Sequence, residues 1–404
     1  MKLALAQLNP IIGDLYGNAE KIYDACKSIR NKEVNLLITP ELSLIGYPPR
    51  DLLFNPRLYE EEKEILDQLS KKVNNLNSNL SILIGIAEPT EDLQIPKLYN
   101  SVIILEKGIW RVVARKQLLP TYDVFDEKRY FRSGNDSSIL YFKHNKKVWK
   151  IGITICEDMW VEQNFQNEKI SGKDPIASLM KEKLDFLINL SASPFTKTKN
   201  LLRKRIAAKA AFRLSCPVIY VNQIGGNDEL IFDGSSFALD KEGNIKKDLP
   251  AFKEKVVICD MASFNQNRSI QRNYPASQEI LFKALVLGVQ DYAKKCNFDS
   301  AIIGLSGGID SALVATIAVA ALGPSKVHAI LMPSPWSSLG SVEDATTLAN
   351  RLGIAHQKIP ISDVMNSFND VLSKSTLGVP EGITAENLQS RIRGTILMAL
   401  ANQK

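Results

Sequence analysis

The stretch Ile151-Gly152-Ile153-Thr154-Ile155-Cys156-Glu157-Asp158-Met159-Trp160 places a short aliphatic run directly before a cysteine and two carboxylates. A short run of branched aliphatic side chains predicts a buried β-strand. Similar runs recur through residues 1–262, and amphipathic stretches with helical spacing lie between them. The predicted strands are Leu3–Leu8, Leu36–Thr39, Ile82–Ile86, Ser101–Leu105, Trp149–Ile155, Phe186–Leu190 and Val218–Val221, and the predicted helices are Asn18–Arg30, Arg57–Val73 and Lys199–Leu214. This alternation predicts a layered α/β domain.

Two further patterns divide the chain. Tyr99–Glu106 and Gly108–Ala114 meet at Lys107-Gly108, which predicts a hairpin and therefore mixed sheets. Residues 263–275, with the polar stretch Phe264–Pro275, are predicted as a linker. Residues 276–404 then form a second α/β pattern, for which a parallel, doubly wound sheet is expected. Its predicted elements are the helix Glu279–Lys294, the buried strand Ala301–Leu305, the helix Ala312–Ala321, the strand Val327–Leu331 and the helix Val342–Leu352.

The bulk composition excludes several classes of protein. A chain of 404 residues with 45% hydrophobic and 23% charged residues is typical of a globular protein with more than one domain. The net charge of +6 is spread without a Lys/Arg block, so no nucleic-acid partner is expected. Five cysteines without a CxxC pair argue against disulfides or a zinc knuckle, and three histidines argue against a His-rich metal site. Met1–Gln7 is too short for a signal peptide and no long apolar run follows, so we expect a cytoplasmic protein without a membrane span.

Three polar residues follow predicted strands of the first domain. Glu41 comes after Leu36–Thr39, Lys116 follows the second run of the hairpin, and Cys156 follows Ile155. Sites in α/β proteins lie at carboxyl ends of strands, so the three side chains can converge. A carboxylate can take the thiol proton, and an ammonium favours thiolate and can hold an oxyanion. The trio therefore predicts attack of a thiol on a carbonyl.

Taken singly, each residue of the trio has a plainer explanation. A cysteine that ends an apolar strand is commonly a buried structural thiol, and a lone lysine or glutamate is commonly on the surface. Glu157 and Asp158 disfavour a thiolate at Cys156. If the segment is extended, however, Glu157 points to the opposite face, and Lys116 dominates.

Three segments, Thr39–Pro49, Arg115–Pro120 and Gly152–Trp160, together resemble the nitrilase (carbon–nitrogen hydrolase) superfamily. The resemblance implies a four-layer α-β-β-α sandwich and amide hydrolysis through a thioester. It assigns Glu41 as the base, Cys156 as the nucleophile, and Lys116 with the Glu157 N–H as oxyanion donors. Glu127 matches the second glutamate of that family, although in its charged surroundings it is otherwise a solvated turn residue.

A glycine turn marks the second domain. Gly304-Leu305-Ser306-Gly307-Gly308-Ile309-Asp310-Ser311 joins a predicted strand to a predicted helix. Backbone N–H groups at such a turn and helix start can hold phosphate oxygens, and the hydroxyls of Ser306 and Ser311 can add hydrogen bonds. Neither a Walker lysine nor GxGxxG is present, and the plainer alternative is a turn that needs glycine for its geometry.

This turn resembles the PP-loop of ATP pyrophosphatases, which leave an adenylated substrate and release pyrophosphate. The resemblance implies ATP as a substrate and Mg²⁺ to screen the triphosphate, with Asp310 as a candidate metal or water contact. No tightly bound organic cofactor is expected.

The pairing of the two domains resembles the glutamine-dependent NAD synthetases, also through Gln223–Gly234, Met332–Ala345 and Glu386–Gly394. This family forms an adenylate from ATP and deamido-NAD, and ammonia from L-glutamine displaces AMP. By the resemblance, Tyr122, Ser193 and Lys199 hold glutamine, Asn387 contacts deamido-NAD, and a homo-oligomer is expected. From the residues alone, Ser193 before Pro194 is a turn former, and Lys199 and Asn387 are surface polar residues.

The chain ends at Lys404. Synthetases of this family continue with further ATP-binding and NAD-binding segments, including a TGNKSE-like stretch, so we expect a partial Rossmann-like PP-loop domain. Three hypotheses remain open: a complete amidotransferase–synthetase, a glutaminase or amidase with a disabled second half, and a non-catalytic assembly or regulatory fragment.

Overall fold

The computed structural model describes residues 1–90, 96, 98–135, 138–160, 173–265, 276–374, 378 and 380–403. The chain divides into two compact units, residues 1–284 and residues 285–404. Each unit has hydrophobic clusters of its own. Among the described residues, no helix combines the length and the apolar character needed to cross a membrane.

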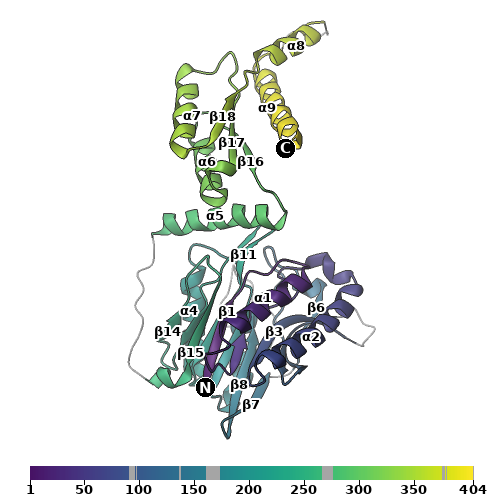
Figure 1. Cartoon of the computed structure of the whole chain (residues 1–404), viewed down its shortest axis with the longest axis vertical. Coiled ribbons are helices and arrows are strands. Elements are labelled where there is room, and N and C mark those ends of the chain that lie inside the picture. Colours follow the sequence, from purple (N-terminus) through teal and green to yellow (C-terminus); the bar gives the residue numbers. More distant parts are fainter. Residues whose placement is uncertain are drawn as a thin grey trace. The chain divides into compact units, whose positions relative to one another are not determined.

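The first unit contains two large mixed sheets (Figure 1). The first sheet has the order β15 (Lys255–Asp260), β1 (Lys2–Gln7), β2 (Leu36–Ile38), β3 (Ser81–Pro89), β4 (Leu98–Glu106) and β5 (Ile109–Arg115), with β6 (Phe131–Arg132) beside β4. The second has the order β14 (Ile245–Asp248), β13 (Phe237–Leu239), β10 (Val218–Asn222), β9 (Phe186–Ser191), β8 (Lys147–Ile155) and β7 (Ile139–His144). A separate hairpin joins β11 (Ile224–Asn227) to β12 (Leu230–Asp233).

Alternation along the strands sorts their side chains into layers. In β1, Leu3 and Leu5 belong to the cluster between the sheets, whereas Ala4 and Ala6 belong to the cluster under α1 (Leu15–Ser28) and α2 (Arg57–Leu76). Successive side chains of a strand point to opposite faces, so each sheet packs on both sides. The outer face of the second sheet packs on α3 (Pro175–Leu179) and α4 (Lys199–Leu214). The expected four-layer α-β-β-α sandwich is confirmed.

Each strand and helix predicted for the first unit is present, with ends shifted by a few residues. The predicted hairpin is the antiparallel pair β4–β5. The mixed character is confirmed as well, because β1 pairs in parallel with β2 and antiparallel with β15. Of the predicted linker, residues up to Asn265 lie in the short 3₁₀ helix Met261–Asn265, and residues 266–275 lie outside the described residues.

The second unit contains a parallel sheet with the order β16 (Ala301–Gly304), β17 (Val327–Leu331) and β18 (Ala355–Lys358), as predicted. One hydrophobic cluster joins it to α6 (Ile309–Leu322) and α7 (Leu339–Leu352), and another to α8 (Ser362–Leu372) and α9 (Ile383–Gln403). Consecutive residues of β17, Ala329 and Ile330, enter different clusters, so helices cover both faces. The unit boundary falls within α5 (Ser277–Lys295). The prediction of a fully buried strand Ala301–Leu305 was wrong in one respect. β16 is only half-buried, and the buried residue is Leu305, which follows it.

Candidate active site

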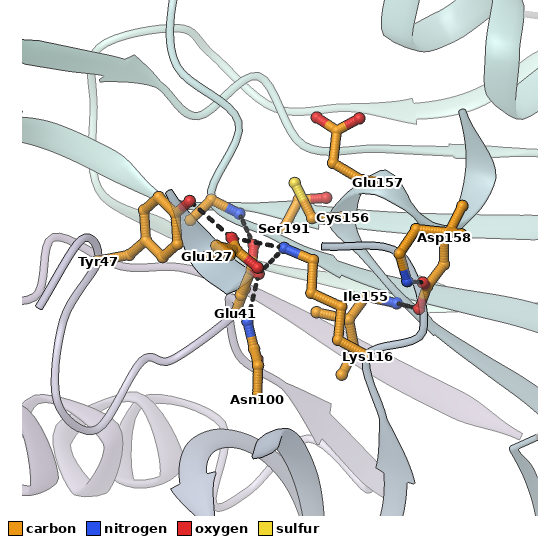
Figure 2. A network of polar contacts seen from close by, with 12 residues as sticks. Glu41, Tyr47, Asn100, Lys116, Glu127, Ile155, Cys156, Glu157, Asp158 and Ser191 are labelled. Carbon is orange, nitrogen blue, oxygen red and sulfur yellow. Dashed lines mark hydrogen bonds and ion pairs between the residues drawn. The ribbon is translucent and has the colours of Figure 1, made fainter. Parts of the chain in front are cut away.

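Glu41, Lys116 and Cys156 follow β2, β5 and β8, and the structure brings them together in the first unit (Figure 2). The Lys116 Nζ donates hydrogen bonds to Glu41 Oε1 at 2.7 Å and to Glu127 Oε1 at 2.8 Å. Lys116 is 1% exposed and Glu41 is 0% exposed, so the charges meet away from bulk water. Glu127 is also buried, contrary to the solvated position that its charged neighbours favour. The packing of the turn that follows Pro120 buries Glu127 despite its charged sequence neighbours.

Neighbouring groups hold the two carboxylates in place. Asn100 Nδ2 donates to Glu41 Oε1 at 2.7 Å, and the Ala192 N–H donates to Glu41 Oε2 at 2.9 Å. The Tyr47 hydroxyl donates to Glu127 Oε1 at 2.7 Å. Sequence reasoning missed Asn100, whose only signal is an amide within a buried, mostly apolar strand. It also missed Tyr47, although this residue lies within a segment that carries the nitrilase resemblance.

Charge and burial compete in this group. Burial lowers the pKa of Lys116, but the carboxylates of Glu127 and Glu41 outweigh that effect, and the pKa lies well above its ordinary value. Burial raises the pKa of Glu127 to about 7, although Lys116 opposes the rise. Lys116 is therefore a permanent cation, and its presence keeps the two facing carboxylates compatible.

Cys156 begins a 3₁₀ turn, Cys156–Met159, and its φ of 44° lies in the left-handed region. The expectation of an extended segment after Ile155 is therefore wrong. Burial first, and then the Glu41 carboxylate, raise the pKa of the Cys156 thiol well above its ordinary value, while Lys116 lowers it. The thiol is consequently protonated at rest and needs a base during attack.

Glu157 influences the Cys156 thiol less than Lys116 does, as expected, although it is not remote from the site. It is buried, and its charge contributes to the raised pKa of Cys156. Tyr122 donates to Glu157 Oε1 at 3.0 Å, while Oε2 has no hydrogen-bond partner within the described part of the chain. In Figure 2 the Glu157 carboxylate points away from Glu41 and Lys116. A buried carboxylate oxygen without a partner can accept a hydrogen bond from a ligand.

Lys199 is buried, which corrects the surface position that its residue type favours. It is the first residue of α4, and its Nζ lies 5.5 Å from the centre of the Trp160 ring. Burial lowers the pKa of Lys199, while the carboxylate of Glu157 opposes this shift. The Lys199 cation and the Glu157 carboxylate thus interact with each other and with Cys156.

Ser193 is buried and sits in a turn held from two sides. Its N–H donates to Asn222 Oδ1 at 2.8 Å, and Arg203 Nε donates to its Oγ at 3.1 Å. Arg203 also pairs with Asp233 at 2.7 Å, both residues being buried. Sequence reasoning missed Arg203, because nothing in the helical pattern of α4 distinguishes it from the other Arg and Lys residues of that helix.

The glycine turn lies in the second unit, between β16 and α6. Ser306 and Ser311 contact each other through their hydroxyls at 3.0 Å, and the Gly308 N–H donates to Ser306 Oγ at 3.3 Å. Gly307 has a φ of 84°, and a Cβ there would lie 2.2 Å from the Ser341 carbonyl oxygen, so only glycine fits. Helix α6 begins at Ile309, three residues earlier than predicted.

A cavity of about 190 Å³ adjoins this turn and is lined by Gly304, Leu305, Ser306, Met332, Ser341 and Arg393 among others. Asp310 is exposed in the first turn of α6, and Asn387 is exposed on α9. Among the described residues no group of three or more His, Cys, Asp or Glu could hold a metal ion. A single exposed carboxylate next to the glycine turn is compatible with Mg²⁺, which is commonly held by one or two carboxylates and substrate phosphates.

Known proteins resemble the chain in both of its parts. The family model described as carbon–nitrogen hydrolase matches residues 2–264, and the NAD synthase model matches residues 281–404. The glutamine-dependent NAD(+) synthetase of Synechocystis sp. is 45% identical over 99% of this chain and 72% of its own length.

Solved structures agree with these matches. The structure of the glutamine-dependent NAD+ synthetase from Acinetobacter baumannii, in complex with adenosine diphosphate, has a TM-score of 0.89 and 35% identity over 100% of this chain and 72% of its own. An amidase from Nesterenkonia sp. shares the fold, with a TM-score of 0.51 and 18% identity over 66% of this chain and 93% of its own. With a buried Glu–Lys–Glu group beside a cysteine in one unit and a glycine turn on a parallel sheet in the other, the chain belongs to the family of the glutamine-dependent NAD(+) synthetases.

Proposed function

We propose that the first unit hydrolyses L-glutamine through a thioester at Cys156 and supplies ammonia to an adenylate formed by the second part of the chain. The observation that carries this proposal is the buried ammonium of Lys116, bonded to Glu41 and Glu127 beside a buried thiol. The family consists of carbon–nitrogen ligases with glutamine as amide donor. The full reaction converts deamido-NAD, ATP, glutamine and water to NAD, AMP, pyrophosphate and glutamate.

The protonated resting thiol assigns a base to the first step. As the sulfur attacks the amide carbon, its proton moves to Glu41, the S–C bond forms, and the carbonyl electrons move to oxygen. Lys116 and the Glu157 N–H stabilise that oxyanion. When the C–N bond breaks, Glu41 returns the proton to the leaving nitrogen, which departs as ammonia. Glu41 then takes a proton from water as the water oxygen attacks the thioester carbon. The C–S bond breaks, glutamate is released, and Glu41 returns the proton to the Cys156 sulfur.

The charges around Cys156 favour a zwitterionic substrate over a simple amide. The free Oε2 of Glu157 suits the α-ammonium group of glutamine, and Lys199 suits its α-carboxylate. Tyr122 and Ser193 complete the proposed glutamine site, with the Ser193 turn fixed by Arg203. A short aliphatic amide lacks both charges and would bind far more weakly.

Glutamate release from glutamine tests this half of the proposal. The 404-residue chain is expected to release glutamate, and Cys156→Ala to release none. Mass spectrometry of the enzyme during turnover should detect a glutamyl adduct on Cys156. Undiminished release by Cys156→Ala would refute the thioester.

For the second part we propose that Gly304–Ser311 binds the phosphates of ATP, with Asp310 contacting Mg²⁺ or its water and Asn387 contacting deamido-NAD. The ion would screen the triphosphate and the pyrophosphate leaving group. The hydroxyl pair of Ser306 and Ser311 and the cavity beside them support the phosphate assignment. NAD formation from ATP, Mg²⁺, deamido-NAD and ammonium salts tests it, and Asp310→Asn should raise the Mg²⁺ requirement.

Three further assignments belong to the same proposal. We assign residues 1–262 to the glutaminase domain, residues 263–275 to the linker and residues 276–404 to the synthetase domain. We also propose that the protein forms a homo-oligomer and that it is located in the cytoplasm. Light scattering coupled to size-exclusion chromatography tests the assembly, and a monomeric mass would refute it.

A further inference from the structure

Asp158 lies two residues after Cys156 and is 2% exposed. Its carboxylate accepts three backbone hydrogen bonds: Oδ1 from the N–H groups of Gln117 at 3.0 Å and Leu118 at 2.9 Å, and Oδ2 from the N–H of Ile155 at 3.0 Å. Figure 2 shows this carboxylate beside the main chain, turned away from the Cys156 sulfur. Asp158 therefore does not reach the reacting atoms.

The three N–H groups belong to two distant segments of the chain. Gln117 and Leu118 directly follow Lys116, whereas Ile155 directly precedes Cys156. One carboxylate thus joins the segment that carries the ammonium to the turn that carries the thiol. The left-handed backbone of Cys156 is uncommon for a residue with a side chain, and such a conformation persists only when its surroundings impose it.

We propose that Asp158 is a positioning residue of the glutaminase, which fixes the separation and relative orientation of Lys116 and Cys156 by clamping their two backbone segments. The inference rests on the glutaminase activity proposed above. It assigns to Asp158 a role in kcat, because the geometry that matters is that between sulfur, ammonium and oxyanion. The proposed contacts to glutamine come from other residues, so its KM depends little on the clamp.

Only an acceptor with both oxygens free of hydrogen satisfies this arrangement. Burial raises the pKa of Asp158 to about 6, so the carboxylate is charged at neutral pH. In Asp158→Asn, the amide NH₂ would face an N–H group on one side, where two donors cannot bond. The clamp then holds either the Lys116 segment or the Cys156 turn, but not both.

Asp240 supplies a matched control. It is also buried and accepts backbone hydrogen bonds from Glu242 at 3.1 Å and Asn244 at 2.8 Å, but it shapes the turn between β13 and β14. Asp240→Asn therefore tests the general cost of such a change at a buried turn.

The test compares both variants in the 404-residue chain, by steady-state glutamate release and by amide hydrogen exchange. For Asp158→Asn we expect kcat to fall about 100-fold, as for a misplacement of about 1 Å, with KM changed by no more than about threefold. Exchange at Gln117, Leu118 and Ile155 should quicken by about tenfold or more. Asp240→Asn should change neither kcat nor the exchange rates at Gln117, Leu118 and Ile155. A kcat within threefold of wild type, unchanged exchange, or an equal loss in Asp240→Asn would overturn the inference.

A second variant and the exchange measurement distinguish a failure of the clamp from a failure of folding or of the proposed function. If Asp158→Asn does not fold, Asp158→Glu keeps both acceptor oxygens and shifts them by one methylene, and it should show the same selective loss of kcat. Hydrogen exchange needs no turnover. Absent glutamate release by the wild-type chain would therefore refute the proposed function, whereas unchanged exchange would refute the clamp itself.

Discussion

Replacing Lys116 with methionine removes the cation that holds two buried carboxylates together. In Lys116→Met, Glu41 and Glu127 would face each other without a counter-charge. Breaking a buried pair in this way costs about 3–5 kcal/mol of unfolding free energy. The pKa of Glu127 should rise above its present value of about 7, because Lys116 lowers it. A raised carboxyl pKa in the folded state makes stability fall as pH rises, so the loss should be larger at pH 8 than at pH 6.

The double variant Lys116→Met/Glu127→Gln is the matched control. It removes one of the two facing carboxylates and keeps an oxygen for the Tyr47 hydroxyl. Urea unfolding, followed by tryptophan fluorescence at both pH values, should show that the double variant recovers a large part of the lost stability. Glutamate release should stay at least about 100-fold below wild type in both variants, because the oxyanion donor is gone. Equal stability of wild type and Lys116→Met, or no recovery in the double variant, would refute the electrostatic reasoning.

Three other predictions follow from single residues. Burial raises the pKa of Glu62 in α2 to about 8, so its contribution to stability is complete below the ordinary glutamate pKa and is lost as pH rises through 8. Glu62→Gln should therefore unfold at a higher temperature than wild type at pH 8 but not at pH 4.5, and parallel pH curves would contradict this. Gly307→Ala should weaken ATP binding at least about tenfold, because its Cβ meets the Ser341 carbonyl, while Gly340→Ala, which meets nothing within 4 Å, should not, as isothermal calorimetry can measure. Glu157→Gln should raise the KM for glutamine by about 10- to 100-fold through loss of a charged hydrogen-bond acceptor, and an unchanged KM would exclude the ammonium contact.

The strands predicted from the sequence are those in which branched apolar residues run together, as in Phe186–Leu190. Each packs on both faces in the sandwich, and this double burial is what produces a continuous apolar run. No prediction covered β7 and β14, because polar residues such as Lys143 and Lys247 interrupt their apolar residues. Their pairing depends on neighbouring strands that are distant in sequence, which no local pattern contains.

For the site, the positions of Glu41, Lys116 and Cys156 after strands predicted that the three side chains can converge, and the resemblance of the surrounding segments to the nitrilase superfamily supported this. The buried environment of Glu127 and Lys199 was not predictable from their neighbours, because tertiary packing determines it. The left-handed turn at Cys156 was missed for a related reason. The Asp158 carboxylate in this turn also accepts hydrogen bonds from the Gln117 and Leu118 N–H groups, which only the folded chain brings close.

The proposed base and oxyanion donor extend from the first sheet, whereas the nucleophile extends from the second. Besides the Asp158 clamp, their alignment depends on the contact between the sheets, where Ile38, Val102 and Ile153 pack. A slight sliding of one sheet over the other would separate sulfur from ammonium while leaving every helix and strand intact. Heat or mild denaturant should accordingly abolish turnover before circular dichroism registers any melting.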